Sequence, residues 1–223
     1  GLLENSKSWT VADQKQMLAW LTQYFNWLTT SKIGLGEARE KNNHGSFYDT
    51  QAAAIALYLG KTDFARQIIL DARTKRIARQ IEPDGREPFE LARTLSFGYS
   101  LFNLRALSDL ASLGQNLGID LWHYSTPDGR SLFKALEFVA PYADREKKWP
   151  YEQIHHAGRG DLAELLLRDA AQYLGSNLAD ALKHFPPDEL AASRERLLFQ
   201  TAKIETDSGS APTKHARDRA VQK

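Results

Sequence analysis

"KNNHGSFYDTQAAAIALYLG", residues 41–60, decides how this chain folds. Its second half is rich in Ala, Ile and Leu and is apolar on every side, which is typical of a buried helix. Asp49 or Thr50 is placed to cap this helix, and Gly60 is placed to end it. Its first half gathers two asparagines, a histidine and two aromatic residues directly before the helix. This polar cluster is either a loop that caps a helix or one corner of an active site, and the remaining sequence has to decide between them.

Helical patterns cover most of the chain. The segment 10–28 opens with Thr10 and Asp13 at a capping-box spacing, and its wide apolar face predicts a helix that is covered on more than one side. Similar patterns predict helices at 61–81, 96–114, 131–140, 161–175 and after 187. No strand pattern and no fixed repeat is found, which disfavours a regular solenoid. Amphipathic and wholly apolar helices alternate, which favours an all-α fold of two helical layers, such as an α/α toroid.

The composition narrows the class of protein. The 223 residues are 42% hydrophobic and 26% charged, which is ordinary for a soluble globular protein. The formal net charge of +1 gives no reason to expect nucleic-acid or membrane partners. The chain has no cysteine, so disulfides, thiolate nucleophiles and cysteine metal ligands are excluded. We expect one domain over residues 1–200 and a polar, extended or mobile tail over 201–223.

Four groups of side chains are candidates for chemistry. They are Asn42, Asn43 and His44 with Tyr48; Arg93 with Tyr99; Trp122, His123 and Tyr124; and Trp149, Tyr151, His155 and His156. Each also has a purely structural explanation, as a helix cap, a helix start or core aromatics. Neighbouring histidines point about 100° apart on a regular helix, which disfavours a shared metal ion. No zinc-protease motif, phosphate-binding loop, dinucleotide-binding motif or serine-nucleophile elbow is present in the sequence.

The first two groups resemble the alginate-lyase superfamily of polysaccharide lyases. Residues 41–60 are similar to its Asn-Asn-His-Gly-x-x-Tyr-Asp-x-Gln block, and "RTLSFGYSLFNLRAL" (93–107) is similar to its second block, in which an Arg precedes a catalytic Tyr. The resemblance covers roughly residues 9–175 and implies an (α/α) toroid, in agreement with the helical patterns. Members of this superfamily carry further helices before the first one found here. The resemblance therefore implies that this chain is the C-terminal part of a catalytic domain, whose missing N-terminal part, or another chain, completes the ring.

The resemblance also implies a role for each residue of the two blocks. Tyr99 is the catalytic base and acid, His44 with Asn43 binds and neutralises the substrate carboxylate, and Arg93 stabilises that carboxylate and the tyrosine oxygen. Such residue types suit β-elimination, because hydrogen-bond donors and positive charge must face the carboxylate while the neighbouring C5 proton is removed. A phenol has a pKa of about 10, and a nearby guanidinium favours its ionised form. No metal ion or other cofactor is expected, since the protein's own donors can neutralise the acid.

Two departures from the superfamily pattern bear on the substrate. Phe47 stands where many bacterial members have Trp, and the spacing of six between Arg93 and Tyr99 is one shorter than is typical of them. The shorter spacing fits a branch that cleaves glucuronan and mannuronan. A single tyrosine can serve both the C5 proton and O4 only where these lie on one face of the sugar, as in β-D-mannuronate and β-D-glucuronate. We expect substrate contacts from Asn42, Phe47, Tyr48, Trp149 and Tyr151.

The predicted activity is thus metal-independent syn β-elimination on a β-1,4-linked uronate polymer, either mannuronan (alginate) or glucuronan. The expected partner is an anionic polysaccharide rather than a nucleic acid or a membrane, and the expected location is periplasmic or secreted. Two alternatives stay open, a non-catalytic polysaccharide-binding module and a helical scaffold that binds protein. Four arginines recur on one predicted helix, namely Arg66, Arg73, Arg76 and Arg79. We interpret them as a solvated face rather than a groove for a polyanion.

Overall fold

The computed structural model describes residues 6–155, 158–173 and 176–193. Its longer helices are α1 (Val11–Thr30), α2 (Lys32–Arg39), α3 (Asn43–Tyr58), α4 (Thr62–Ala72), α7 (Ser96–Gln115), α8 (Leu132–Val139) and α9 (Arg159–Asp169). Its short helices are α5 (Ala78–Gln80), α6 (Pro88–Leu91), α10 (Leu178–Ala181) and α11 (Pro187–Ala192). A π-helical turn covers Arg73–Ile77, and 3-10 turns cover Ala140–Ala143, Ala170–Gln172 and Leu182–His184. Within the described ranges there is no strand, only isolated bridges, so the all-α prediction is confirmed. The predicted tail, 201–223, lies outside the described residues.

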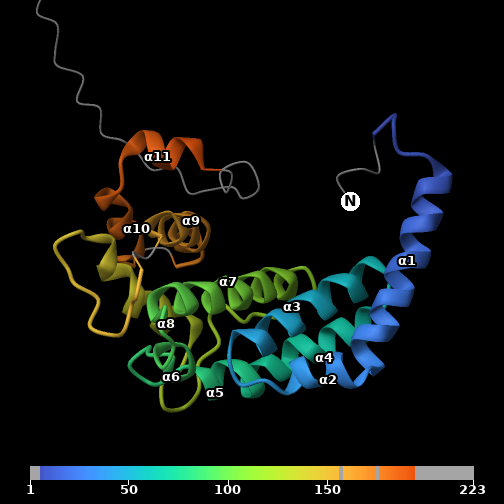
Figure 1. The fold of residues 1–223 in the computed structure, drawn as a ribbon, viewed down its shortest axis with the longest axis horizontal. Coiled ribbons are helices and arrows are strands. Elements are labelled where there is room, and N and C mark those ends of the chain that lie inside the picture. The colour runs from blue at the N-terminus through green and yellow to red at the C-terminus, as the bar shows by residue number, and fades with distance from the viewer. Residues whose placement is uncertain (1–5, 156–157, 174–175, 194–223) are drawn as a thin grey trace, which may run out of the picture.

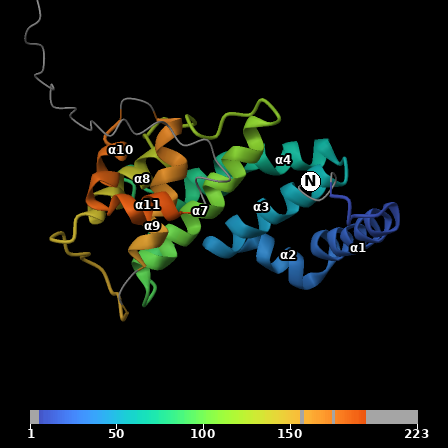
Figure 2. The ribbon, with the colours of Figure 1, turned by 90° about the horizontal axis from the view of Figure 1, so that it is seen from above.

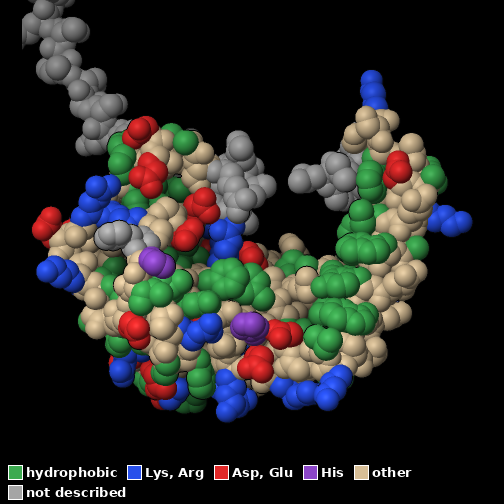
Figure 3. Space-filling view, in the orientation of Figure 1, with side chains coloured by type: hydrophobic (Ala, Val, Ile, Leu, Met, Phe, Trp, Pro, Cys, Tyr) green, Lys and Arg blue, Asp and Glu red, His purple; other side chains and the backbone are tan. Residues whose placement is uncertain are grey.

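The helices form a crescent (Figure 1). Helices α3 and α7 run through its middle, α1 stands at one end, and α9, α10 and α11 form the other end, as the view from above also shows (Figure 2). The space-filling view shows a hollow between these two ends, with α3 and α7 on its floor (Figure 3). The two central helices carry the two sequence blocks singled out above, so the fold brings these blocks together.

The contact between α3 and α7 is the centre of the core. Helix α3 contributes Ala53 and Ala56, which are fully buried, and α7 contributes the larger Leu104 and Leu110, also fully buried in the same cluster. Small residues on one helix facing larger ones on the other let the two backbones approach and interdigitate. The sequence prediction of a buried alanine-rich helix is therefore confirmed.

The cap of α3 differs from the predicted one. Asn42 caps this helix, because its extended backbone lets the side-chain oxygen accept a hydrogen bond from the His44 N–H at 3.2 Å. Asp49 and Thr50, proposed as caps from the sequence, lie inside the helix. Gly60 does end the segment, in the left-handed conformation with φ +72°.

Helix α1 is less covered than its sequence predicts. Its capping box between Thr10 and Asp13 is present, but of its residues only Phe25 and Leu28 are buried. The helix packs against α2 and α3 on one side, so cover on more than one side is not found among the described residues. Trp20 and Trp27 remain 58% and 45% exposed.

Candidate active site

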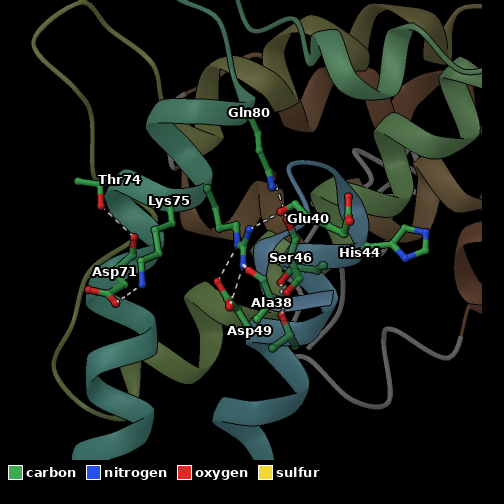
Figure 4. Close-up of polar contacts among 12 residues, drawn as sticks. Ala38, Glu40, His44, Ser46, Asp49, Asp71, Thr74, Lys75 and Gln80 are labelled. Carbon is green, nitrogen blue, oxygen red and sulfur yellow. Dashed lines mark hydrogen bonds and ion pairs between the residues drawn. The ribbon is translucent and has the colours of Figure 1, made fainter. Parts of the chain in front are cut away.

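A buried arginine, Arg76, holds the first sequence block, residues 41–60, in place through hydrogen bonds. The Arg76 side chain, 3% exposed, donates from Nε and Nη2 to the two carboxylate oxygens of Asp49 at 2.7 and 3.1 Å. It also donates to the backbone oxygens of Ala38 at 2.9 Å and Glu40 at 2.8 Å, beside the first turns of α3 (Figure 4). The interpretation of Arg76 as part of a solvated face is therefore wrong. This guanidinium joins α3 to the end of α2 and fixes the loop that precedes His44.

The same arginine explains the glycine of the Asn-Asn-His-Gly block. A Cβ on Gly45 would lie 2.3 Å from Arg76 Nη1 and 2.3 Å from the Glu40 oxygen. A residue with a side chain cannot occupy this position unless Arg76 or the backbone moves. The glycine is thus required by the packing beneath the site rather than by a reaction.

A second buried network joins this block to α7. Gln80 Oε1 accepts hydrogen bonds from Ser46 Oγ at 3.0 Å and from Asn103 Nδ2 at 3.0 Å. Asn103 Nδ2 also donates to Glu87 at 2.6 Å, and Gln80 Nε2 donates to the backbone oxygen of Asn42 at 3.3 Å. Burial strongly raises the pKa of Glu87 above its usual value, against the Asn103 hydrogen bond, which lowers it. Helices α3, α5 and α7 are therefore locked in one register by side chains that sequence patterns do not connect.

Glu90, on α6, is the residue around which the candidate catalytic groups meet. Its two oxygens accept hydrogen bonds from Asn43, one from the backbone N–H at 2.6 Å and one from Nδ2 at 2.8 Å. Burial raises the pKa of the Glu90 carboxyl; the hydrogen bonds from Asn43 and the nearby charges of Arg93 and His44 lower it. Asn43 holds the Glu90 carboxyl, His44 follows Asn43 in the chain, and the Arg93 N–H donates to the Glu90 backbone oxygen at 3.0 Å. The three residues therefore share a neighbourhood although they come from two separate segments.

His44 itself lies on the outer side of this arrangement. Its ring points away from the Arg76 network (Figure 4), and its side chain is 51% exposed. Glu37, on α2, holds the ring through a contact of 2.7 Å between its Oε2 and Nδ1. The other ring nitrogen is left for a different partner. Glu37 was not predicted from the sequence.

Arg93 and Tyr99 form the second half of the site. The guanidinium carbon of Arg93 lies 4.0 Å from the centroid of the Tyr99 ring, a close cation–π contact. Tyr99 stands in the first turn of α7, and the start of this helix is held by an adjacent segment. Ser96 donates from its N–H and its hydroxyl to the Glu152 oxygen, and the Phe97 N–H donates to Gln153 Oε1. These three hydrogen bonds fix the helix start, and with it the position of Tyr99.

Two hollows open beside these residues and share one wall. The hollow of His44 has a volume of about 300 Å³ and that of Tyr99 about 390 Å³. The first is lined by Leu28, Glu37, Asn43, His44, Phe47, Tyr48, Gln51 and Phe102. The second is lined by Leu95, Gly98, Tyr99, Leu101, Phe102, Arg105, Asp161, Glu164, Leu165 and Arg168. Phe102 lines both, and its ring centroid lies 4.2 Å from that of Phe47. The two sequence blocks thus meet on either side of one aromatic ring.

With this geometry in view, comparison with known proteins identifies the family. Residues 1–149 match the sequence profile described as alginate lyase. The chain belongs to the alginate lyase family. It is similar to a crystal structure at 1.60 Å resolution of an alginate lyase from Bacteroides ovatus, with a TM-score of 0.79 and 39% identity over 83% of this chain. The chain spans 50% of the length of that protein. Among curated proteins, none matches this chain significantly.

Family membership agrees with the resemblance and with the fold expected from it. The helical layers of this chain and those of the Bacteroides alginate lyase fit an α/α toroid. In the described part of the chain, no helix is both long and apolar enough to span a membrane. Within the same ranges, no group of three or more His, Asp or Glu side chains is arranged to hold a metal ion.

Four of the residues expected to contact substrate make structural contacts in the fold. Trp149 donates from Nε1 to Ser96 Oγ at 2.7 Å and packs 5.2 Å from Tyr151 in an aromatic cluster, and neither residue lines the hollow of His44 or of Tyr99. Asn42 uses its side-chain oxygen as the cap of α3. Tyr48 is buried against Leu28, although it does reach the His44 hollow.

The remaining candidates lie elsewhere. Trp122 is fully buried core, and His123 is paired with Asp120 at 2.8 Å on the surface. The Arg73 guanidinium lies over the ring of Tyr124. His155 is exposed, and His156 lies outside the described residues. Of these candidates, those within the described residues line neither of the two hollows.

Sequence patterns missed several residues that shape the site, namely Glu37, Glu90, Phe102, Arg105 and Glu164. Phe102 carried a usable signal, because it follows Tyr99 by three positions and therefore shares its face of α7. Glu90 carried none, since a glutamate in a polar turn region is usually exposed. Arg105 and Glu164 pair across the Tyr99 hollow at 3.2 Å, and only the packing of α7 on α9 brings them together.

Proposed function

We propose that this chain provides the catalytic site of a polysaccharide lyase that cleaves a β-1,4-linked uronate polymer by β-elimination. The observation that carries the proposal is the convergence of Asn43, His44 and Arg93 around Glu90, with Tyr99 held beneath the Arg93 guanidinium. Membership of the alginate lyase family supports the reaction class. A helical scaffold that binds protein does not require these four residues to lie together, so the arrangement argues against that alternative.

In the proposed mechanism, the first block binds the uronate carboxylate. The amide Nδ2 of Asn43 has two hydrogens, of which one is donated to Glu90, so the other is available to the substrate. In its imidazolium form, His44 donates from Nδ1 to Glu37 and from Nε2 to the same carboxylate. Two fixed donors on one carboxylate withdraw charge from it, and this makes the neighbouring C5 proton easier to remove.

Tyr99 is proposed to move the proton. Its phenolate oxygen takes the proton from C5, and the electron pair left on C5 forms the C4–C5 double bond. The C4–O bond breaks, and O4 leaves with the proton that the same phenol returns. Both transfers occur on one face of the sugar, so the proposed substrate is a polymer of β-D-mannuronate or β-D-glucuronate. Arg93, in contact with the Tyr99 ring, supplies positive charge for the phenolate and the carboxylate.

Other parts of the proposal rest on the chain and the family together. Phe47 and Phe102 form the aromatic surface between the two hollows, where a sugar ring in contact with both blocks has to lie. The periplasmic or secreted location and the independence from metal ions stay predictions. We also propose that the lyase domain extends over residues 1–200.

The activity can be tested by the ultraviolet absorbance of the unsaturated product. We expect product from mannuronan or glucuronan and much less from polyguluronate, in which the C5 proton and O4 lie on opposite faces. Tyr99→Phe should lower kcat by about 10²- to 10⁴-fold, the usual contribution of a general acid–base group. Tyr58→Phe, a change of the same atoms at a surface position on α3, should retain activity.

Two outcomes would contradict this proposal. Full activity in Tyr99→Phe would remove the tyrosine from the chemistry. Saturable binding of the polymers with no unsaturated product would instead favour the alternative, a polysaccharide-binding module without catalysis.

A further inference from the structure

Helix α1 carries a row of aromatic side chains that the proposed chemistry does not use. Trp20, Tyr24 and Trp27 follow one another at helical spacing and therefore share one face. The rings of Trp20 and Tyr24 are nearly parallel, 4° apart, with centroids 5.7 Å from each other. The rings of Tyr24 and Trp27 follow at 21° and 5.8 Å. We call these three residues the aromatic row.

The faces of these rings are partly open to solvent. Carbon atoms in contact lie about 3.5 to 4.0 Å apart. Parallel rings with centroids 5.7 Å apart must therefore be displaced sideways, so that each covers only part of the next. The exposures of Trp20 and Trp27, 58% and 45%, agree with this stepped arrangement. Figure 3 shows hydrophobic side chains gathered along α1 beside the hollow of the crescent. Large exposed aromatics in a row mark a binding surface rather than a stable solvated face.

The aromatic row is continuous with the hollow of His44. The Tyr24 hydroxyl donates to Gln51 Oε1 at 3.0 Å, and Gln51 lines that hollow. Leu28, next to Trp27 in the chain, lines it too. A ligand that leaves the candidate active site on this side therefore meets Tyr24 and its neighbours first.

The side chains around the row suit a polymer of sugar acids. From Gln14 to Thr30, α1 contains one charged residue, Lys15, and no carboxylate that would repel a uronate. Its other polar side chains there are amides and hydroxyls, which can hydrogen-bond to sugar hydroxyls. The C–H groups on a pyranose face carry slight positive charge and pack well on the negative face of an aromatic ring. Beyond Trp20, a further hollow is lined by Asp13, whose carboxylate repels a uronate. The aromatic row therefore ends at Trp20.

We propose that the aromatic row binds pyranose rings of the same uronate polymer, several sugar units away from the bond that is cleaved. The inference rests on the proposed function, because it takes its ligand from that function. It adds a binding surface on α1 whose three residues line neither of the two hollows, and this surface serves long substrates. Short oligosaccharides that fill only the two hollows do not reach it.

The first test compares long and short substrates. In the double variant Trp20→Ala/Trp27→Ala, KM for the polymer should rise about tenfold or more, while kcat/KM for the shortest cleaved oligosaccharide should stay within about twofold. The flat replacements Trp20→Phe/Trp27→Phe should recover most of the loss. Val11→Ala/Ile33→Ala removes exposed apolar side chains off the row, 89% and 68% exposed, and should behave as wild type.

The second test measures binding without turnover, so that it does not depend on the catalytic proposal. In the Tyr99→Phe background, electrophoresis through gels that contain mannuronan or glucuronan should retard the protein, and the two alanine changes should abolish most of this retardation. If no variant ever yields unsaturated product but the alanine changes still weaken retardation, the catalytic proposal fails and the row stands. Equal retardation of the proteins with and without the two alanine changes overturns the proposed role of the aromatic row. A change of oligomeric state in the alanine variant, with polymer binding intact, assigns the row to a second copy of the chain and overturns it as well.

Discussion

Glu90 accepts hydrogen bonds from both the backbone N–H and the side-chain amide of Asn43, at 2.6 and 2.8 Å. Asn43 is the first residue of α3, and Glu90 lies in α6, just before Arg93. The backbone N–H of Arg93 in turn donates to the backbone oxygen of Glu90 at 3.0 Å. Through its buried carboxyl and its backbone oxygen, Glu90 therefore sets the position of the carboxylate-binding block relative to the segment that leads to Tyr99.

This relationship makes Glu90 a positioning residue for the proposed reaction. In Glu90→Gln, one acceptor becomes an NH₂ donor that faces another donor of Asn43, so one of the two hydrogen bonds is lost. We expect kcat to fall about 10- to 100-fold, because small displacements of catalytic groups have costs of this size. Stability should fall by about 1 to 3 kcal/mol, the cost of an unpaired buried polar group. Both quantities can be measured, by product absorbance and by urea unfolding.

The control for this change is Glu146→Gln, which alters an exposed carboxylate and should change neither quantity. A purely structural role for Glu90 predicts a different pattern. The variant would then be less stable but, at a temperature where it is fully folded, would show wild-type kcat. That result would remove Glu90 from the site.

Patterns in the sequence predicted what local physics determines. The alanine-rich α3, the capping box of α1 and the start of α8 at Ser131 follow from periodicity and capping chemistry, and all three are confirmed. The meeting of the two blocks was expected from a family resemblance, which family membership supports. Local periodicity alone could not have placed His44 and Arg93 around one carboxyl.

What could not be predicted depends on tertiary contacts. Arg76 looks like one of four surface arginines, but a π-helical turn and the carboxylate of Asp49, twenty-seven positions earlier, place it inside the protein. Trp149 was expected to contact the substrate, but its indole Nε1 donates a hydrogen bond to Ser96 at the start of α7. The exposed row on α1 looks like a core face, because a tryptophan stripe at helical spacing has the same pattern whether or not another element covers it.

The packing under the Asn-Asn-His-Gly block gives a prediction on stability. Gly45→Ala places a methyl group against Arg76 and the Glu40 backbone, so we expect a loss of about 1 to 3 kcal/mol in the free energy of unfolding, as for other overpacked sites. Gly36→Ala is the matched control, because a Cβ there meets nothing within 4 Å and Gly36 lies within α2. This control should gain about 0.5 to 1 kcal/mol from helix propensity. Equal effects of the two changes, measured by urea unfolding, would contradict the role assigned to Arg76.

The burial of Glu87 gives a prediction on the pH dependence of stability. Its pKa in the folded protein is raised well above the usual 4.5, with burial as the main cause. Between 4.5 and the raised value, the folded state holds a proton that the unfolded state has released. The contribution of this group to stability is therefore complete below that range and is lost as the pH rises through it. The buried carboxyls of Glu90 and Asp169 also have raised pKa values and act in the same direction.

Glu87→Gln keeps the acceptor that Asn103 uses but cannot ionise, so its free energy of unfolding should depend less on pH. Within the range between the two pKa values, the variant should gain on the wild type by about 1.4 kcal/mol for each pH unit. Urea unfolding between about pH 5 and about pH 8 measures this difference, and Glu146→Gln should follow the wild-type curve because its carboxylate is exposed in the folded state. Parallel curves for the wild type and Glu87→Gln would show that Glu87 does not carry a proton in the folded protein over this range, and the buried network between α3, α5 and α7 would then contain a charged carboxylate.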